Sequence, residues 1–261
     1  MKKTIEEHLK ITSDLMRPNS IDYINYIFSD FIEMHGDRLF GDDLSIITGI
    51  GLLDNIPVTV VGQNRGKTIK EQLKYHYSMN YPEGYRKSLR AIKQAEKFKR
   101  PVVCFVDTIG AYPGKDAEER GQSNAIAANL MEMMYLKVPV ISVIIGFGGS
   151  GGALALSVAD KVIMLEYATF GVISPKACAN ILWKDTSREI EAAELLKITP
   201  KELKNFGFVD TIVTEENGDS KDSFSIVADK VKLEIKNFLT KCANVSFDDL
   251  LKSRYNRYMN F

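Results

Sequence analysis

A glycine-rich junction between two apolar segments is the strongest constraint on how this chain folds. Residues 138–145 (VPVISVII) predict a fully buried strand, and residues 150–159 (SGGALALSVA) predict a short helix. The junction, residues 146–152 (GFGGSGG), contains five glycines. Main-chain N–H groups without flanking side chains can approach a ligand directly, and a helix start adds unpaired donors and partial positive charge. This chemistry suits an anion, or an oxygen that becomes negatively charged during a reaction.

Four interpretations of the glycine run fit its local chemistry. The spacing G-x-G-x-x-G from Gly146, with Glu166 20 residues later, is typical of a dinucleotide-binding turn. The spacing G-x-S-x-G centred on Ser150 is typical of a nucleophile elbow. The third interpretation is an oxyanion hole without its own nucleophile, and the fourth is a turn that only allows close packing of the helix on the strand.

The rest of the chain argues against the first two interpretations. A serine nucleophile needs a base, and the elbow motif places its histidine downstream. All three histidines, at positions 8, 35 and 76, precede Ser150. The dinucleotide interpretation is weaker than the oxyanion hole because a long βα region precedes the run and the following helix is short.

Residues 62–68 (GQNRGKT) resemble a phosphate-binding Walker A loop after a strand, but the spacing is one residue short. Such a loop must wrap a phosphate with successive N–H groups, so the missing residue matters. A cationic loop beside a cleft, or a solvated loop, is the preferred interpretation.

Composition narrows the class of protein. The chain has 261 residues, 45% of them apolar, and a formal net charge of zero, so neither nucleic acid nor an anionic membrane is an expected partner. The three cysteines form no CxxC pair, and the charged amino-terminal segment lacks the apolar core of a signal peptide. We expect a cytoplasmic protein without a structural zinc site or a membrane span.

The order of predicted elements indicates an α/β fold. Predicted helices cover 20–34, 82–99, 117–136, 150–159, 187–196, 200–205 and 223–241, and predicted strands cover 46–53, 56–62, 101–107, 138–145, 161–165, 169–173 and 208–213. Parallel strands bind ligands at their carboxyl ends, where the glycine-rich loops 108–114 and 146–152 fall.

The chain is predicted to divide into three regions. These are an amino-terminal helical segment at 1–45, an α/β core at 46–215 and a carboxyl-terminal helix and tail at 216–261. The first segment places His8 in a surface helix. A polar break at 217–222 opens the third region, and the basic, aromatic tail at 252–261 (KSRYNRYMNF) is expected to dock on the core.

Several blocks closely resemble the family of bacterial acetyl-coenzyme A carboxylase carboxyltransferase α subunits. These blocks are 35–43 (HGDRLFGDD), 81–90 (YPEGYRKSLR), 107–122 (DTIGAYPGKDAEERGQ), 146–156 (GFGGSGGALAL), 172–175 (VISP), 181–185 (ILWKD) and 191–199 (EAAELLKIT). They occur in the family's order over residues 20–215, which is far more specific than one glycine motif. The resemblance implies the crotonase fold, a superhelix of ββα units.

The resemblance also implies a reaction and its partners. The family moves a carboxyl group from carboxybiotin, carried on a separate protein, to acetyl-CoA, giving malonyl-CoA for fatty acid biosynthesis. The implied partners are a carboxyltransferase β subunit with a zinc ribbon, a biotin carboxyl carrier protein and biotin carboxylase, in an α₂β₂ carboxyltransferase. No metal is implied in this chain.

The site residues follow from both arguments. The expected oxyanion donors are the main-chain N–H groups of Gly148, Gly149, Gly151, Gly114 and Lys115. The expected substrate-binding residues are Gly110, Ala111, Tyr112, Gly146, Phe147, Ser150, Arg65 and Ser174. Leu154 stands where enoyl-CoA hydratases of the crotonase superfamily carry their glutamate, so hydration is not expected.

Several departures from the family pattern fall near the expected cleft. Among them, Phe147 stands where the family usually has glutamate, Lys176-Ala177 stand where it has glutamate-glycine, and Arg65-Gly66 stand where it has lysine-glycine. They leave two alternatives to an acetyl-CoA-specific subunit: a paralogous subunit for another acyl-CoA, or a non-catalytic scaffold. An NAD-dependent dehydrogenase is a more distant alternative.

Overall fold

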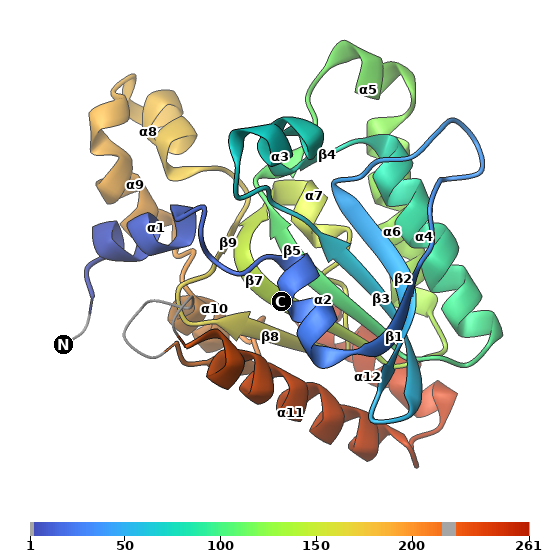
Figure 1. Ribbon diagram of the computed structural model, residues 1–261. Coiled ribbons are helices and arrows are strands. Elements are labelled where there is room, and N and C mark those ends of the chain that lie inside the picture. Colours follow the sequence, from blue (N-terminus) through green and yellow to red (C-terminus); the bar gives the residue numbers. More distant parts are fainter. Residues whose placement is uncertain (1–2, 216–222, 261) are drawn as a thin grey trace.

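The centre of the molecule is an eight-stranded sheet, shown in Figure 1. The structure is a computed structural model that describes residues 3–215 and 223–260. The strand order is β1-β2-β3-β5-β7-β8-β10, and β9 pairs with the end of β7. The first three strands are antiparallel, and the pairs from β3 to β10 are parallel. The strands of this sheet are β1 (Ser29–Glu33), β2 (Ile46–Leu53), β3 (Ile56–Gln63), β5 (Val102–Thr108), β7 (Val140–Gly149), β8 (Lys161–Leu165), β9 (Thr169–Gly171) and β10 (Thr211–Val213). Strands β4 (Met79–Asn80) and β6 (Gly110–Ala111) pair with each other in a separate two-stranded sheet.

Helices connect and cover these strands. They are α1 (Ile5–Ser13), α2 (Ser20–Ile27), α3 (Ile69–Lys74), α4 (Pro82–Lys97), α5 (Lys115–Glu119), α6 (Gln122–Tyr135), α7 (Ser150–Leu154), α8 (Pro175–Trp183), α9 (Glu189–Leu196), α10 (Pro200–Asn205), α11 (Phe224–Cys242) and α12 (Phe247–Met259), with short 3₁₀ turns at His76–Ser78 and Thr186–Arg188. Helix α4 packs on α6 and on β2 and β3, and α2 packs on α11. Helices α1, α8 and α9 gather at one end of the sheet beside β9 (Figure 1). None of the described helices is long and apolar enough to cross a membrane.

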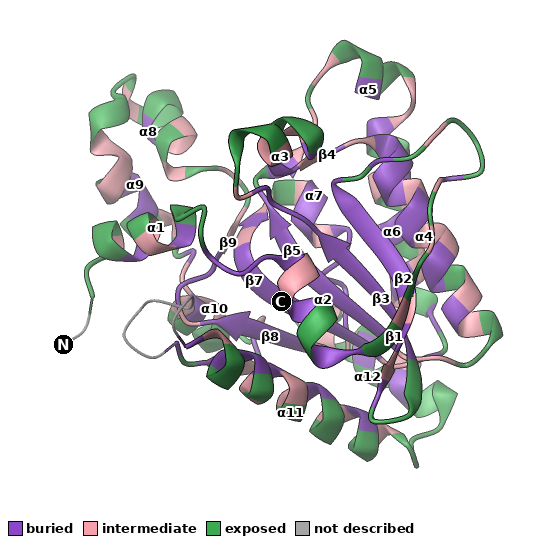
Figure 2. Ribbon diagram, viewed as in Figure 1, coloured by how far each residue is buried: buried purple, intermediate pink, exposed green. Residues whose placement is uncertain are grey.

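The core lies around the central parallel strands. Every residue of β5 is buried, and so are the first seven of β7 (Figure 2). Parallel strands that are covered on both faces have near-continuous apolar sequences rather than alternating ones. The predicted strands at 101–107 and 138–145 are confirmed for this reason, and the strands predicted at 46–53 and 56–62 are confirmed as β2 and β3, which pair as an antiparallel hairpin. Asp54 and Asn55 at its turn both have positive φ, 46° and 71°, as the favoured two-residue turn requires.

The predicted helix at 20–34 is wrong beyond Ile27. Residues Ser29–Glu33 form β1, which pairs antiparallel with β2 across the predicted boundary at residue 45. A Cβ atom on Gly49 would lie 2.4 Å from Cζ of Phe31, so the Phe31 ring packs in the space that the missing side chain of Gly49 leaves on β2. Burial of this ring against the sheet outweighs the helical periodicity of the segment.

Three further boundaries differ from prediction. The helix expected at 117–136 is broken at Gly121, whose φ of 83° is left-handed, into α5 and α6. The strand expected at 138–145 continues through the glycine run to Gly149, and the helix expected at 150–159 ends at Leu154. The strand expected at 208–213 is formed only at Thr211–Val213. The polar break at 217–222 lies outside the described residues.

The first and last described helices pack against the rest of the molecule. Helix α12 contacts α6, and its Arg254 side chain is fully buried, which confirms the predicted docking of the tail. Helix α1 is present, but His8 is not on a solvent-facing surface: it is 8% exposed, and its Nε2 is 2.9 Å from the Ala168 carbonyl oxygen. Burial lowers the pKa of His8 from its usual value.

Asp37 organises the turn in the segment 35–43. Its Oδ1 accepts hydrogen bonds from the main-chain N–H groups of residues 39–41 at 2.8–2.9 Å, and its Oδ2 accepts one from Arg86 Nε at 2.8 Å. Burial alone would raise the pKa of this carboxyl, but the hydrogen bonds outweigh burial and lower the pKa to about 2.

This carboxylate predicts an acid-sensitive contribution to stability. Because the folded pKa lies below the unfolded value, the contribution is fully present above about pH 4 and is lost as the pH falls towards 2. The stability difference between the wild type and Asp37→Asn should therefore shrink from pH 5 to pH 3, measured by urea unfolding. Asp248→Asn, at an exposed site in α12, is the control; a difference for Asp37→Asn that does not change with pH would contradict this assignment.

Candidate functional site

A cleft of about 800 Å³ lies at the carboxyl ends of β7 and β9. Its walls come from α1 (Glu6, Leu9, Lys10, Ser13), the glycine run (Phe147, Gly148, Gly149, Ser150) and the start of α8 (Ser174, Pro175, Lys176). The cleft is completed by Ile109, which follows β5, by Glu189 and Ile190 of α9, and by β9 with its flanking residues. The carboxyl ends of parallel strands are the usual ligand-binding edge of an α/β sheet.

The glycine run continues β7 instead of forming a separate loop. Gly148 pairs with Thr108 of β5 on one side and with Phe170 of β9 on the other. A Cβ atom on Gly148 would lie 2.2 Å from Cδ2 of Phe170, and one on Gly149 would lie 2.3 Å from the main-chain carbon of Ile109. Close packing therefore explains these two glycines, and their main-chain groups are engaged in strand pairing.

Gly151 has no such packing constraint. The nearest atom to an added Cβ would be Cγ2 of Ile126, at 3.8 Å. Gly151 follows Ser150 in the first turn of α7, where helix geometry leaves the main-chain N–H groups without intrahelical partners. Ser150 is exposed and has a left-handed φ of 52°, a costly conformation for a residue with a side chain. The start of α7 therefore has main-chain N–H groups without intrahelical partners next to Ser150, which lines the cleft, whereas Gly151 itself is not among the lining residues.

The second glycine-rich loop, residues 108–114, packs closely against the glycine run at 146–152. A Cβ atom on Gly149 would lie 2.8 Å from the nitrogen of Gly110, and one on Gly152 would lie 2.7 Å from that of Ala111. The structure therefore brings the two predicted loops together. Only Ile109 of this region lines the cleft, whereas the predicted residues Gly110, Ala111, Tyr112, Gly114 and Lys115 do not. The Tyr112 ring stacks on Tyr81, and the Lys115 side chain is 89% exposed.

The remaining predicted substrate-binding residues divide into two groups. Phe147, Ser150 and Ser174 line the cleft, although the Ser174 hydroxyl also caps α8 by accepting a hydrogen bond from the Ala177 N–H at 3.2 Å. Gly146 and Arg65 are not among the residues that line the cleft. Arg65 is 6% exposed and forms an ion pair with Asp107, so residues 62–68 form neither a solvated loop nor a cationic cleft wall at this position.

None of the histidines, all of which the structure describes, supplies a base for Ser150. His8, His35 and His76 have their polar contacts with Ala168, Asp42 and Asp43 respectively, away from Ser150. The Cys104 thiol is fully buried, and burial raises its pKa to about 12, which disfavours the reactive thiolate. A nucleophile elbow that uses a histidine base is therefore excluded among the described residues, and a Ser–Lys pair is the form of that interpretation that stays open, because Lys10 and Lys176 line the same cleft as Ser150.

Contributions from α1 and α9 were not predicted from the sequence. Lys10 and Glu6 approach a glycine run that is more than 130 residues away along the chain. Only the amphipathic pattern of α1 and its capping box at Thr4 were visible signals, and these mark a helix without showing where it docks.

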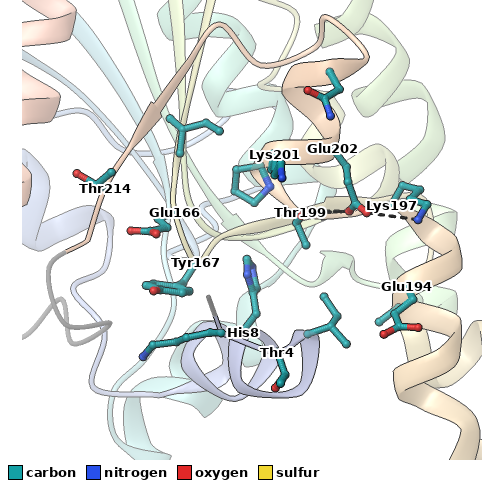
Figure 3. A pocket seen from close by; sticks show the side chains of 16 residues that line it. Thr4, His8, Glu166, Tyr167, Glu194, Lys197, Thr199, Lys201, Glu202 and Thr214 are labelled. Carbon is teal, nitrogen blue, oxygen red and sulfur yellow. Dashed lines mark hydrogen bonds and ion pairs between the residues drawn. The ribbon is translucent and has the colours of Figure 1, made fainter. Parts of the chain in front are cut away.

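A second cavity of about 780 Å³ lies on the other side of α1, between α9, α10 and β10 (Figure 3). His8 and Tyr167 point into it, and Lys197 forms an ion pair of 3.5 Å with Glu202 across one wall. Glu166 lines this cavity and accepts a hydrogen bond from the Glu215 N–H at 2.9 Å. Glu166 is therefore not part of the glycine-run cleft, whereas a dinucleotide-binding turn would require it to be there.

Solved structures define the fold. The chain superposes on the transcarboxylase 12S structure with a TM-score of 0.65 and 20% identity, covering 82% of this chain and 41% of that one. It superposes on the β subunit of Pseudomonas aeruginosa geranyl-CoA carboxylase with a TM-score of 0.68 and 15% identity, covering 92% of this chain and 45% of that one. The fold is that of the crotonase-like carboxyltransferases, as the resemblance implied.

Sequence relatives define the family. The acetyl co-enzyme A carboxylase carboxyltransferase-like family matches residues 2–261, and the chain belongs to it. A Clostridium perfringens protein named acetyl-coenzyme A carboxylase carboxyl transferase subunit alpha is 55% identical over 252 residues, which are 97% of this chain and 93% of the relative. A protein of the same name from Shouchella clausii is 52% identical over 97% of this chain and 78% of its own length. The family predicted from the sequence blocks is confirmed.

Proposed function

We propose that this chain is the α subunit of an acetyl-CoA carboxylase carboxyltransferase, which moves a carboxyl group from carboxybiotin to acetyl-CoA to give malonyl-CoA. The observation that carries the proposal is the cleft at the glycine run, in a chain of this family. We further propose a cytoplasmic location, an α₂β₂ assembly with a zinc-ribbon β subunit, and supply by a biotin carboxyl carrier protein and biotin carboxylase.

The cleft fits the chemistry of this transfer. Bound carboxybiotin supplies the carboxyl group and, after its release, a ureido nitrogen that can take a proton from the methyl carbon of acetyl-CoA. Negative charge develops on oxygen in this reaction, and fixed N–H donors stabilise such charge by about 3–4 kcal/mol per donor. Gly151, in the first turn of α7, is the principal donor in this proposal.

The other predicted donors take secondary roles in the proposal. Gly148 and Gly149 shape the floor of the cleft through strand pairing, and Gly114 and Lys115 lie at the start of α5, outside the cleft lining. Phe147 and Lys176 line the cleft, which supports a role for these two departures in acyl-CoA choice. An aromatic ring and an ammonium group replace carboxylates there, so the cleft favours anionic substrate groups more than the usual family pattern does.

Reverse transfer tests the proposal. The chain is co-purified with its β subunit and supplied with malonyl-CoA and free biotin, and acetyl-CoA formation is measured. We expect biotin-dependent turnover from the complex and little from the α chain alone. An assembled complex with no turnover on any acyl-CoA would support the scaffold alternative and overturn the proposal; turnover only on another carboxylated acyl-CoA would identify a paralogous subunit.

A further inference from the structure

We propose that Asp107 and Arg65 are positioning residues that hold the two walls of the cleft, the glycine run and α1, in fixed relation to each other. The inference rests on the proposed function. The two side chains form an ion pair of 3.4 Å, between Asp107 Oδ2 and Arg65 Nε, and both contact Phe147 of the cleft; the exposed fractions of Asp107 and Arg65 are 2% and 7%. Burial of such an ion pair costs desolvation free energy, so the other contacts of each side chain indicate what the pair does in the structure.

Asp107 holds the glycine run. It lies near the carboxyl end of β5, and its Oδ1 accepts a hydrogen bond of 2.9 Å from the main-chain N–H of Phe147. A Cβ atom on Gly146 would lie 2.3 Å from the same oxygen. The carboxylate therefore occupies the space of the missing Gly146 side chain and fixes the peptide that leads into the cleft.

Arg65 holds α1. Its Nη1 donates to the carbonyl oxygen of Thr12, and its Nη2 donates to that of Asp14, each at 3.0 Å. These carbonyls lie at the carboxyl end of α1, whose Ser13 and Lys10 line the cleft. The guanidinium also lies 5.4 Å from the centre of the Phe147 ring. One side chain therefore contacts both walls.

The pair also has an electrostatic role. An isolated carboxylate directly behind the glycine run would oppose negative charge developing on a substrate oxygen in the cleft. Arg65 neutralises it in surroundings where charges are poorly screened. Loss of Arg65 should therefore impair the reaction more than loss of both charges together.

Kinetics of the αβ complex test this arrangement with Arg65→Met, Asp107→Asn and the double variant. We expect Arg65→Met to lower kcat about 10- to 100-fold, the usual effect of a small misplacement of reacting groups. KM for malonyl-CoA should change less than about threefold. The isosteric Asp107→Asn should be milder, since its amide oxygen can still accept from Phe147. The double variant should recover several-fold over Arg65→Met. Strictly multiplicative effects, or kcat of Arg65→Met equal to that of the wild type, would overturn the inference.

Hydrogen exchange supplies a readout that does not depend on activity. In Arg65→Met, amides in residues 9–14 and 146–151 should both exchange faster, because one side chain restrains both segments. The control is Arg254→Lys, which weakens a buried ion pair on α12 far from the cleft along the chain and should leave both segments unchanged. No change in Arg65→Met, or the same change in Arg254→Lys, would refute the link. An inactive wild-type complex with the expected exchange pattern would refute the proposed function alone.

Discussion

Replacing Gly151 with valine is expected to reduce carboxyl transfer by about 100- to 1,000-fold, the usual cost of losing one oxyanion donor. The branched side chain would crowd the approach to the main-chain N–H groups at the start of α7. Folding should be little affected, because the nearest atom to an added Cβ lies 3.8 Å away and Gly151 does not have a positive φ. The measurements are acetyl-CoA formation from malonyl-CoA by the αβ complex, and the thermal midpoint of the variant chain.

Gly149→Val is the matched control. Its Cβ would lie 2.3 Å from the main chain of Ile109, so this variant should lose stability as well as activity. The contrast separates the two roles of glycine in one short segment. Wild-type turnover in Gly151→Val would remove this residue from the site, and equal losses of stability in both variants would show that its role is packing.

Arg254→Ala is expected to lower the free energy of unfolding by about 3–5 kcal/mol, because it leaves a buried carboxylate without its partner. Arg254 Nε and Nη2 bind the Asp160 carboxylate at 2.8 and 2.6 Å. Its Nη1 and Nη2 also donate to the carbonyl oxygens of Met133, Leu136 and Val138 at 2.7–3.0 Å. The side chain ties α12 to α6 and to the segment before β7. Urea unfolding of the purified chain measures the effect.

An exposed ion pair gives the comparison for Arg254. Lys93 and Glu132 are 2.7 Å apart but 54% and 41% exposed, so Lys93→Ala should cost less than about 1 kcal/mol. A small effect of Arg254→Ala, similar to that of Lys93→Ala, would mean that α12 contributes little to the folded core. Loss of α12 protection in hydrogen exchange, with β7 unchanged, would show that the helix detaches as a unit.

Local patterns in the sequence predicted much of the fold. The buried strands β5 and β7 and the β2–β3 hairpin were recognisable because their apolar runs and turn residues fix them locally. β1 was missed because its conformation depends on a surface that another strand provides: the Phe31 ring lies where Gly49 leaves space. The split between α5 and α6 depends on one left-handed glycine, which a helical pattern alone does not show.

The site was predictable in its centre and not at its margins. The glycine run was identified from composition and spacing, and Phe147, Ser150 and Ser174 do line one cleft. The wall formed by α1 is a long-range contact, for which one sequence contains no signal. Arg65 was misjudged because a basic residue in a glycine-containing loop resembles a ligand contact, whereas its partners are a buried carboxylate and two carbonyl oxygens.

The pairing of the glycine run within the sheet has a consequence for assembly. Gly148 is paired with strands on both sides and Gly149 with β9 on one side, so the floor of the cleft is formed together with the sheet. In the proposed function, the isolated chain would then carry its share of the cleft geometry before a β subunit binds. Docking of a second subunit need not order this segment, and its binding energy remains available for recruiting and orienting the reactants.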